Sequence, residues 1–224
     1  MCGRFTLFDS DAILSKAFGV PISFDLTPRY NVAPSQPILT VRVSPETGKR
    51  EFAWLRWGLV PHWAQDPSIG NRMINARGET VAEKPAFRDA FQRRRCLVPA
   101  SGFFEWKKGE RRKQPYYIRM KDGRLFVFAG LWDLWKGPDG SPVESCTLIT
   151  TDANNVVAQL HDRMPVIMPH AAYDLWLGTE IQERGHLLSL LHPYPAEEME
   201  AYPVGFFVND PKTEDLRCIA RLQE

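Results

Sequence analysis

The sequence lacks the features that mark several large classes of protein. Its 28 Lys and Arg are matched by 27 Asp and Glu, so the net charge near +1 gives no overall field that recruits nucleic acid or an anionic membrane. No stretch approaches the roughly 18 apolar residues of a membrane span, and the N-terminal segment is too short and polar for a signal peptide. We expect a cytoplasmic protein without a membrane partner, which would hold any polyanion by a local patch.

Cysteine is scarce and shows no paired spacing. The five histidines do not supply a zinc-finger or HExxH spacing either. We therefore expect no metal, no cofactor and free thiols in a reducing compartment. The four cysteines are Cys2, Cys96, Cys146 and Cys218.

No Ser/Gly-rich linker and no internal repeat divides the chain. With 44% hydrophobic residues, the 224 residues can build a substantial core, which predicts one domain over residues 1–224. Short β-rich runs are separated by turn dipeptides such as Asp122-Gly123 and indicate hairpins in a single α+β domain around antiparallel sheet. The expected strands are 37–43, 51–57, 95–98, 103–107, 116–120, 125–131 and 145–150, and the expected helices are 9–19, 84–94, 152–160, 170–177 and 181–191.

The most reactive feature is Cys2. Its small side chain allows a methionine aminopeptidase to remove Met1, which would leave a 1,2-aminothiol at the new N-terminus. The amine has a reference pKa of about 7.7 to 8.0 and the thiol of about 8.5, so both are partly reactive at neutral pH. The amine can form a Schiff base with an aldehyde, and the thiolate can close a thiazolidine. The alternative is that Cys2 merely follows the start codon.

Several polar residues occur where strand or turn patterns do not require them. Glu105 lies in an aromatic strand, as either a solvated carboxylate or a carboxylate whose pKa is raised by an apolar pocket. His161 follows an expected helix, and either interacts with its dipole or moves protons. Asn75 is a turn residue or orients a nucleophile, and Arg77 pairs with Glu79 or binds phosphate.

Basic residues gather at positions 93–95, 107–108 and 111–113. Such runs either lie on a solvated surface or bind phosphates. Trp63 lies in a Gly/Pro loop near Arg56, a composition that suits stacking on unpaired bases.

Seven segments together resemble the SRAP family, the SOS response-associated peptidases also called abasic-site-processing proteins. Any one of these segments alone is weak evidence for the family, but their joint occurrence in family order is very specific to it. They are residues 1–5 (MCGRF), 29–34 (RYNVAP), 57–61 (WGLVP), 74–80 (INARGET), 96–100 (CLVPA), 102–106 (GFFEW) and 161–165 (HDRMP).

The resemblance implies an α+β fold built on an antiparallel, barrel-like β-sheet with surrounding helices. It also implies a reaction in which an abasic site in single-stranded DNA is crosslinked to the N-terminal cysteine as a thiazolidine. Cys2 would supply the amine and thiol, and Asn75 would position the amine. Glu105 would relay protons, and His161 would assist Schiff-base formation and opening of the sugar ring.

The resemblance further implies the DNA contacts. Three arginines would hold phosphates with a threonine nearby, and a proline turn and a tryptophan loop would stack on or wedge apart bases; these residues are Arg4, Arg77, Arg163, Thr150, Pro34 and Trp63. We expect a monomeric, nucleoid-associated protein of the DNA damage response. Its activity would be a lyase-like self-modification, with removal of Met1 as its peptidase-type step.

This mechanism requires one pocket that contains Cys2, Asn75, Glu105 and His161. Glu105 must be partly desolvated, and nearby cations such as Arg4 would help the Cys2 thiol to ionise. Two other functions stay open: an N-terminal-nucleophile hydrolase that acylates Cys2, and a non-covalent reader of modified or unpaired bases.

Overall fold

The computed structural model describes residues 2–107, 112–179 and 183–223. One sheet closes into a barrel in the order β10 (Pro142–Asp152), β4 (Arg50–Trp57), β3 (Pro37–Val43), β6 (Arg95–Ala100) and β9 (Phe126–Lys136), because β9 pairs back onto β10. The short strands β5 (Asn75–Arg77) and β11 (Arg163–Pro165) are both added to β10. Strand β10 therefore connects the barrel to two segments that carry polar sequence motifs.

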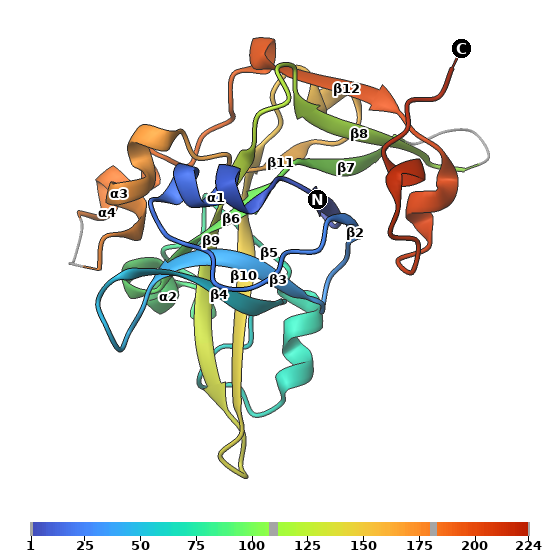
Figure 1. Cartoon of the computed structure of the whole chain (residues 1–224). Helices are drawn as coiled ribbons and strands as arrows, with labels where there is room; N and C mark the ends of the chain where they lie inside the picture. The colour runs from blue at the N-terminus through green and yellow to red at the C-terminus, as the bar shows by residue number, and fades with distance from the viewer. Residues whose placement is uncertain (1, 108–111, 180–182, 224) are drawn as a thin grey trace.

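The second sheet is antiparallel, and Figure 1 shows its strands β12, β8 and β7 above the barrel. Its order is β12 (Met199–Pro203), β8 (Gln114–Met120), β7 (Gly102–Lys107), β1 (Phe5–Leu7) and β2 (Arg29–Val32). The N-terminal strand β1 is thus an inner strand between β7 and β2. This position holds the residues just before β1 alongside β7, and Cys2 among them is fully buried.

An aromatic core joins the two sheets. Phe5 of β1 packs edge-on against Trp57 of β4, with ring centroids 5.3 Å apart, and Phe103 of β7 packs similarly on Phe128 of β9 at 5.9 Å. All four side chains are almost completely buried. A full aromatic side chain contributes about 1.5 to 3 kcal/mol by burial, so these contacts hold β1 firmly against the barrel.

Helices surround the sheets. Leu14 and Phe18 lie one turn apart on α1 and are buried, and α1 ends at Gly19, which adopts the left-handed conformation with φ 67°. A second core cluster lies between the barrel and helices α1 to α3. The helices are α1 (Asp11–Phe18), α2 (Arg88–Arg93), α3 (Tyr173–Leu177) and α4 (Arg184–Leu188), with 3-10 turns η1 (Pro67–Arg72), η2 (Val157–Gln159), η3 (His170–Ala172), η4 (Ala196–Glu198), η5 (Phe206–Asn209) and η6 (Leu216–Cys218).

Arg95 belongs to a basic run for which the sequence allowed a solvated surface, but its side chain is buried. Its guanidinium donates to the carbonyls of Phe91 (2.7 Å), Gln92 (2.6 Å) and Trp176 (2.6 Å), and also to that of Gly178. These carbonyls belong to the C-terminal ends of α2 and α3, where the helices leave acceptors without partners. Burial lowers the pKa of Arg95 to about 10.

The structure confirms the expected fold class and most of the expected strands, with β9 and β10 several residues longer than predicted. The helix predicted at 152–160 is wrong. β10 continues to Asp152, and the Asn154 side chain then accepts bonds from the amides of Val156 and Val157, which leaves room only for the short η2 turn. Of the helix predicted at 181–191, residues 181 and 182 lie outside the described residues, and α4 covers 184–188.

Two further differences concern strand pairing. β10 pairs in parallel with β4 and β5, whereas the sequence indicated antiparallel hairpins. The strands β1, β2, β5, β11 and β12 were not predicted, because three to five residues are too few to show an alternating pattern. Within the described ranges, no helix is long and apolar enough to cross a membrane.

Candidate active site around Cys2

Cys2 lies shortly before β1, separated from it by Gly3 and Arg4, and is completely buried. Its thiol contacts the backbone carbonyl of Arg4 at 3.9 Å. The side-chain amide of Asn75, the first residue of β5, donates to the Cys2 carbonyl at 2.9 Å. The Asn75 Oδ1 atom is buried and accepts no hydrogen bond from the part of the chain that the structure describes. Asn75 therefore fixes the Cys2 backbone and leaves an acceptor beside it.

Glu105 approaches Cys2 from the neighbouring strand. The antiparallel register of β1 and β7 pairs Phe5 with Phe103, and the Phe104 amide donates to the Arg4 carbonyl at 3.0 Å, so Glu105 comes alongside the residues before Arg4. Only 3% of Glu105 is exposed. Burial raises the pKa of Glu105, and the neighbouring His161 opposes this rise. The sequence left Glu105 as either a solvated carboxylate or a carboxylate in an apolar pocket. The structure shows the buried carboxyl.

The Cys2 thiol is held in its protonated form. Burial raises its pKa above the ordinary thiol range, and the negative charge of Glu105 raises it further. Arg4, which we expected to favour the thiolate, is engaged elsewhere: its Nη1 donates to Asn31 Oδ1 at 2.7 Å and to the Val208 carbonyl at 2.5 Å. Cys2 and Glu105 are therefore close enough to interact through their charges, and a free thiolate is disfavoured.

His161 lies between η2 and β11, close enough to Glu105 to lower the pKa of that carboxyl. Its Nδ1 faces both the Arg163 amide at 3.0 Å and Asp162 Oδ1 at 2.8 Å. The amide requires an unprotonated Nδ1, and we favour this contact because the Asp162 carboxylate is largely exposed and screened by water. A hollow of about 560 Å³ opens beside His161, with Trp106 and Lys113 in its wall.

The structure brings Cys2, Asn75, Glu105 and His161 into one neighbourhood, from the start of β1, β5, β7 and the turn before β11. Met1, whose removal the sequence predicts, lies outside the described residues. A buried carboxyl with a raised pKa beside a thiol and a histidine can accept and return protons at neutral pH. This neighbourhood is the candidate active site.

Arg77, Thr150 and Arg163 occupy neighbouring strands. Thr150 of β10 pairs with Arg77 of β5, and β10 also pairs with β11, which begins at Arg163. The Arg77 side chain is exposed. Arg163 instead forms a bidentate ion pair with Glu79, at 2.6 and 2.9 Å, and contacts Asp152 at 2.7 Å. The sequence left Glu79 as a partner for Arg77, but the structure pairs it with Arg163.

The two base-contact candidates lie on connected loops. Pro34 is in a β-turn closed by the Gln36 amide on the Ala33 carbonyl, in which Ser35 has φ 69°. The Ser35 hydroxyl donates to Asn71 of η1 at 3.1 Å. Trp63 lies on the loop between β4 and η1, with half of its side chain exposed.

Asn31 has a structural role that the sequence did not reveal. It is fully buried, and its side-chain amide donates to the carbonyls of Asp210 at 2.9 Å and Thr213 at 3.0 Å, while its oxygen accepts from Arg4. The Glu214 carboxylate accepts a hydrogen bond from the backbone amide of Asn31 at 3.1 Å. These bonds tie the C-terminal segment (residues 206–218) to β2 and to the residues after Cys2. The partners are about 180 positions apart in the sequence, so no local pattern could have shown the contact.

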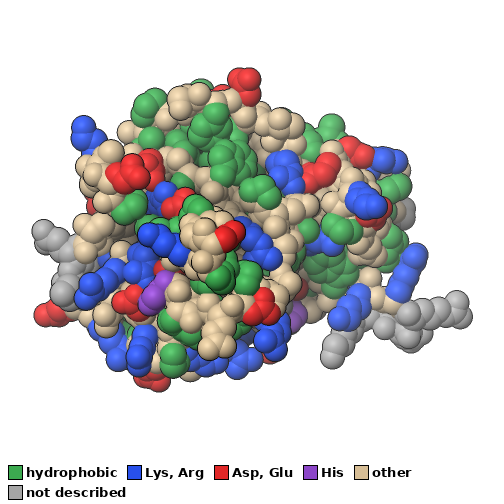
Figure 2. All heavy atoms as spheres, turned by 90° about the horizontal axis from the view of Figure 1, so that it is seen from below, with side chains coloured by type: hydrophobic (Ala, Val, Ile, Leu, Met, Phe, Trp, Pro, Cys, Tyr) green, Lys and Arg blue, Asp and Glu red, His purple; other side chains and the backbone are tan. Residues whose placement is uncertain are grey.

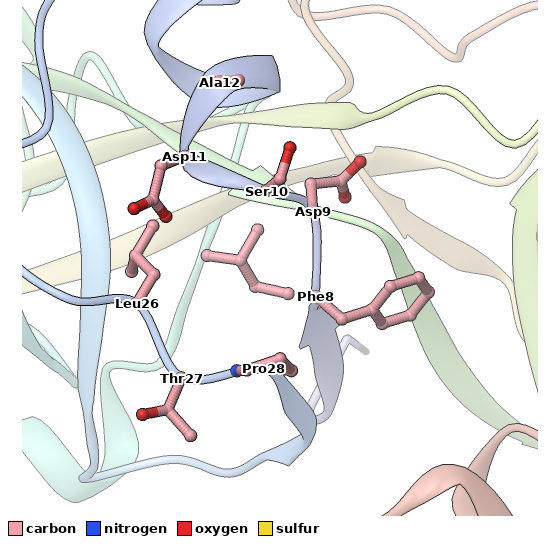
Figure 3. A pocket seen from close by; sticks show the side chains of 9 residues that line it. Phe8, Asp9, Ser10, Asp11, Ala12, Leu26, Thr27 and Pro28 are labelled. Carbon is pink, nitrogen blue, oxygen red and sulfur yellow. The ribbon is translucent and has the colours of Figure 1, made fainter.

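The structure contains other hollows outside this neighbourhood. Figure 3 shows one of about 440 Å³ at the start of α1, where the Asp9 and Asp11 side chains point away from each other. The Ser101 hydroxyl bonds to Asp9. No group of three or more potential metal-ligating side chains occurs in the described parts of the chain, and all four cysteines are free thiols there.

Comparison with known families supplies the classification. The family model described as SOS response associated peptidase (SRAP) matches residues 1–211. The chain belongs to the SRAP family. The family motifs at Cys2, Asn75, Glu105 and His161 are thus the segments that meet in the candidate active site.

Curated relatives of this chain are named abasic site processing proteins. The chain is 45% identical to the abasic site processing protein YoqW of Bacillus subtilis (strain 168), over 98% of this chain and 99% of the relative. It is 31% identical to the abasic site processing protein HMCES of Xenopus tropicalis, over 87% of this chain and 66% of the relative.

Solved structures share the fold. A crystal structure of a protein from Bacteroides thetaiotaomicron superposes with a TM-score of 0.89 at 28% identity, covering 99% of this chain and all (100%) of the other. One from Bordetella bronchiseptica superposes with a TM-score of 0.77 at 25% identity, covering 91% of this chain and 100% of the other. The barrel and second sheet are therefore the fold of the family.

Proposed function

We propose that this chain processes abasic sites in single-stranded DNA by forming a covalent crosslink through Cys2 after removal of Met1. The proximity of Cys2, Asn75, Glu105 and His161 carries the proposal, because an N-terminal aminothiol and proton-transfer groups are what an aldehyde trap needs. The names of the curated relatives support the substrate. The crosslink would shield the lesion during the DNA damage response.

The reaction begins at the amine. The Cys2 amine adds to the aldehyde carbon of the ring-opened deoxyribose, and loss of water gives an imine. The Cys2 thiol then adds across the C=N bond, with sulfur on carbon and hydrogen on nitrogen, to give a thiazolidine. The products are one crosslink and one water, with no oxidation or reduction.

The electrostatics support this order. Glu105 has a raised pKa and can protonate the departing hydroxyl as a neutral acid. Its carboxylate can then take the thiol proton, which matters because burial disfavours the free Cys2 thiolate. The Asn75 Oδ1 acceptor suits a hydrogen bond from the Cys2 amine, and His161 Nε2 suits proton transfer to the opening sugar ring.

DNA binding would use exposed groups around the site. Arg77 presents an exposed guanidinium beside Thr150, and Trp63 and Pro34 offer surfaces for bases. Arg163 would reach a phosphate by exchanging Glu79 or Asp152. Arg4 is committed through Nη1 to the C-terminal segment, so its contribution to phosphate binding would come from the rest of its guanidinium.

We further propose that residues 1–224 act as one domain and as a monomer, nucleoid-associated in the cytoplasm. A core cluster containing residues of both sheets supports the single domain. One chain supplies all four residues of the candidate active site, which supports the monomer.

A denaturing gel tests the proposed reaction. The protein is incubated with a single-stranded oligonucleotide carrying one abasic site. We expect a slow-migrating adduct that is absent in Cys2→Ala and retained in the matched control Cys218→Ala, since Cys218 is a free thiol outside the site. Native binding without any adduct would replace the crosslinking proposal with a non-covalent reader.

A further inference from the structure

The C-terminal segment packs directly on strand β7 beside the candidate active site. Val208 of η5 is fully buried in one cluster with Phe104. The Oδ1 atom of Asn209 accepts a hydrogen bond from the Trp106 indole at 2.8 Å. Phe104 and Trp106 are the residues on either side of Glu105. The C-terminal segment therefore supports the part of β7 that carries Glu105.

The same segment holds one end of the Arg4 guanidinium. Nη1 of Arg4 donates to Asn31 Oδ1 at 2.7 Å and to the Val208 carbonyl at 2.5 Å, which uses both of its hydrogens. The Asn31 side-chain amide donates to the carbonyls of Asp210 and Thr213, so both acceptors of Arg4 belong to one network with residues 208–213. Because a guanidinium is planar, fixing Nη1 also fixes the direction of the opposite edge.

That opposite edge, formed by Nε and Nη2 of Arg4, makes no hydrogen bond to the residues that the structure describes. Arg4 is partly exposed. Nε and Nη2 lie side by side and match two oxygens of a phosphate group. Burial lowers the pKa of Arg4, so a bound anion would offset the cost of its charge. The structure thus presents an arginine whose outward edge is already oriented.

We propose that residues 208–213 are part of the phosphate-binding site, with Asn31 as the positioning residue that orients Arg4 toward a phosphate beside the abasic site. The inference rests on the proposed function for its ligand, and adds Asn31 and the Val208 carbonyl to it. An arginine oriented in advance loses little conformational entropy when it binds a phosphate. If Nη1 is released, the side chain regains that freedom, and the affinity for DNA falls although Arg4 itself is unchanged.

Such coupling acts in both directions. If residues 208–213 favour phosphate binding at Arg4, a phosphate bound there stabilises these residues by the same free energy. Bound DNA should therefore slow local opening around the exposed Lys212, which is a cleavage site for trypsin. Opening at the exposed Lys49, in the turn between β3 and β4, should be unaffected.

Binding of a single strand that carries a tetrahydrofuran analogue of the abasic site tests the positioning role, because the analogue has no aldehyde and cannot crosslink. We expect Arg4→Gln and Asn31→Ala each to weaken binding about three- to tenfold and to reduce the salt slope by about one phosphate contact. The double variant should bind as weakly as Arg4→Gln alone, because Asn31 acts through Arg4. A loss of affinity that adds to that of Arg4→Gln would show that Asn31 only supports the fold.

Val208→Ala is a milder variant that leaves the charges around Arg4 unchanged. It shortens a fully buried side chain, so the carbonyl of residue 208 is held less firmly. We expect binding of the same strand to weaken about twofold, with no further loss in the Arg4→Gln background. Val41→Ala makes the same change at a fully buried position of β3, and is the matched control whose affinity should not change.

Limited digestion with trypsin tests the reverse direction. We expect a saturating concentration of the tetrahydrofuran strand to slow cleavage after Lys212 about three- to tenfold in the unmodified protein, but not in Arg4→Gln at the same fractional saturation. Cleavage after Lys49 is the internal reference. Equal protection of Lys212 in both proteins would show that DNA merely covers this segment, which contradicts the coupling.

The outcomes separate this inference from the proposed function. If an abasic strand forms an adduct but the losses of Asn31→Ala and Arg4→Gln add, residues 208–213 do not position Arg4, and the proposed reaction is unaffected. If the two losses do not add and Lys212 is protected, but no adduct forms with an abasic strand, the proposed reaction is wrong and the positioning role is supported.

Discussion

At the scale of single residues, Glu105 connects burial to chemistry. A carboxyl whose pKa is raised in the folded protein binds its proton more tightly there than in the unfolded chain. The sign follows directly: folding stability falls as pH rises above the ordinary value of 4.5 through the raised pKa, because the folded state must then ionise a buried group. Glu105 is thus retained at a cost in stability.

The variant Glu105→Gln tests whether Glu105 lowers stability and supports the reaction. The amide keeps the shape but neither ionises nor donates an acidic proton, so we expect adduct formation to slow by about 10²-fold. Binding of intact single strands should be unchanged. The thermal midpoint of the variant should rise relative to that of the unmodified protein as the pH increases above 4.5. Equal losses of binding and crosslinking, measured by titration and single-turnover kinetics, would assign Glu105 a structural part only.

Asn31 illustrates the opposite case, a residue whose importance depends on distant backbone. Asn31→Ala removes the donors to Asp210 and Thr213 and the acceptor for Arg4, all at a buried position. We expect a loss of about 2 to 4 kcal/mol in the free energy of unfolding, measured in urea. Cleavage by a protease within residues 206–218 should accelerate. An unchanged stability would show that the C-terminal segment is held by other contacts.

At the scale of elements, strand β10 organises the site. It pairs with β4, β5, β9 and β11, and so brings together segments that carry Arg77 and Arg163. The sequence predicted residues 145–150, the central part of β10, but not its extension to Asp152. Beyond that point, helical spacing in residues 152–160 competed with the Asn154 turn and with pairing to β11, and tertiary contacts decided the outcome.

Arg95 tests how the helices are held to the barrel. Arg95→Leu removes the donors from four carbonyls at the C-terminal ends of α2 and α3. We expect the free energy of unfolding to fall by about 3 kcal/mol, and Arg95→Lys to recover only part of it, because an ammonium cannot reach carbonyls on both helices. Arg93→Leu, at an exposed position at the end of α2, is the matched control and should change little.

At the scale of the whole molecule, charge is mixed rather than segregated. Figure 2 shows Lys and Arg interspersed with Asp and Glu over the face seen from below. This agrees with the net charge of +1, which pointed to local patches rather than a field. Single-stranded DNA would then be bound by a few exposed groups, such as Arg77 and Trp63.

The sequence predicted the fold class and the candidate residues because seven motifs occur together. It could not predict which neighbours those residues would have. Arg163 forms an ion pair with Glu79. Arg4 donates to the Val208 carbonyl, and Asn31 donates to the Thr213 carbonyl. Each of these contacts joins segments far apart in the chain, and such pairings depend on the tertiary arrangement of the strands rather than on local pattern.

Intact mass spectrometry of the protein before and after incubation with an abasic single-stranded oligonucleotide tests the central claim most directly. We predict a starting mass that lacks Met1 and a product equal to that protein plus one oligonucleotide less one water, absent in Cys2→Ala. A starting mass that retains Met1, or a protein lacking Met1 whose mass is unchanged by the oligonucleotide, would contradict the account.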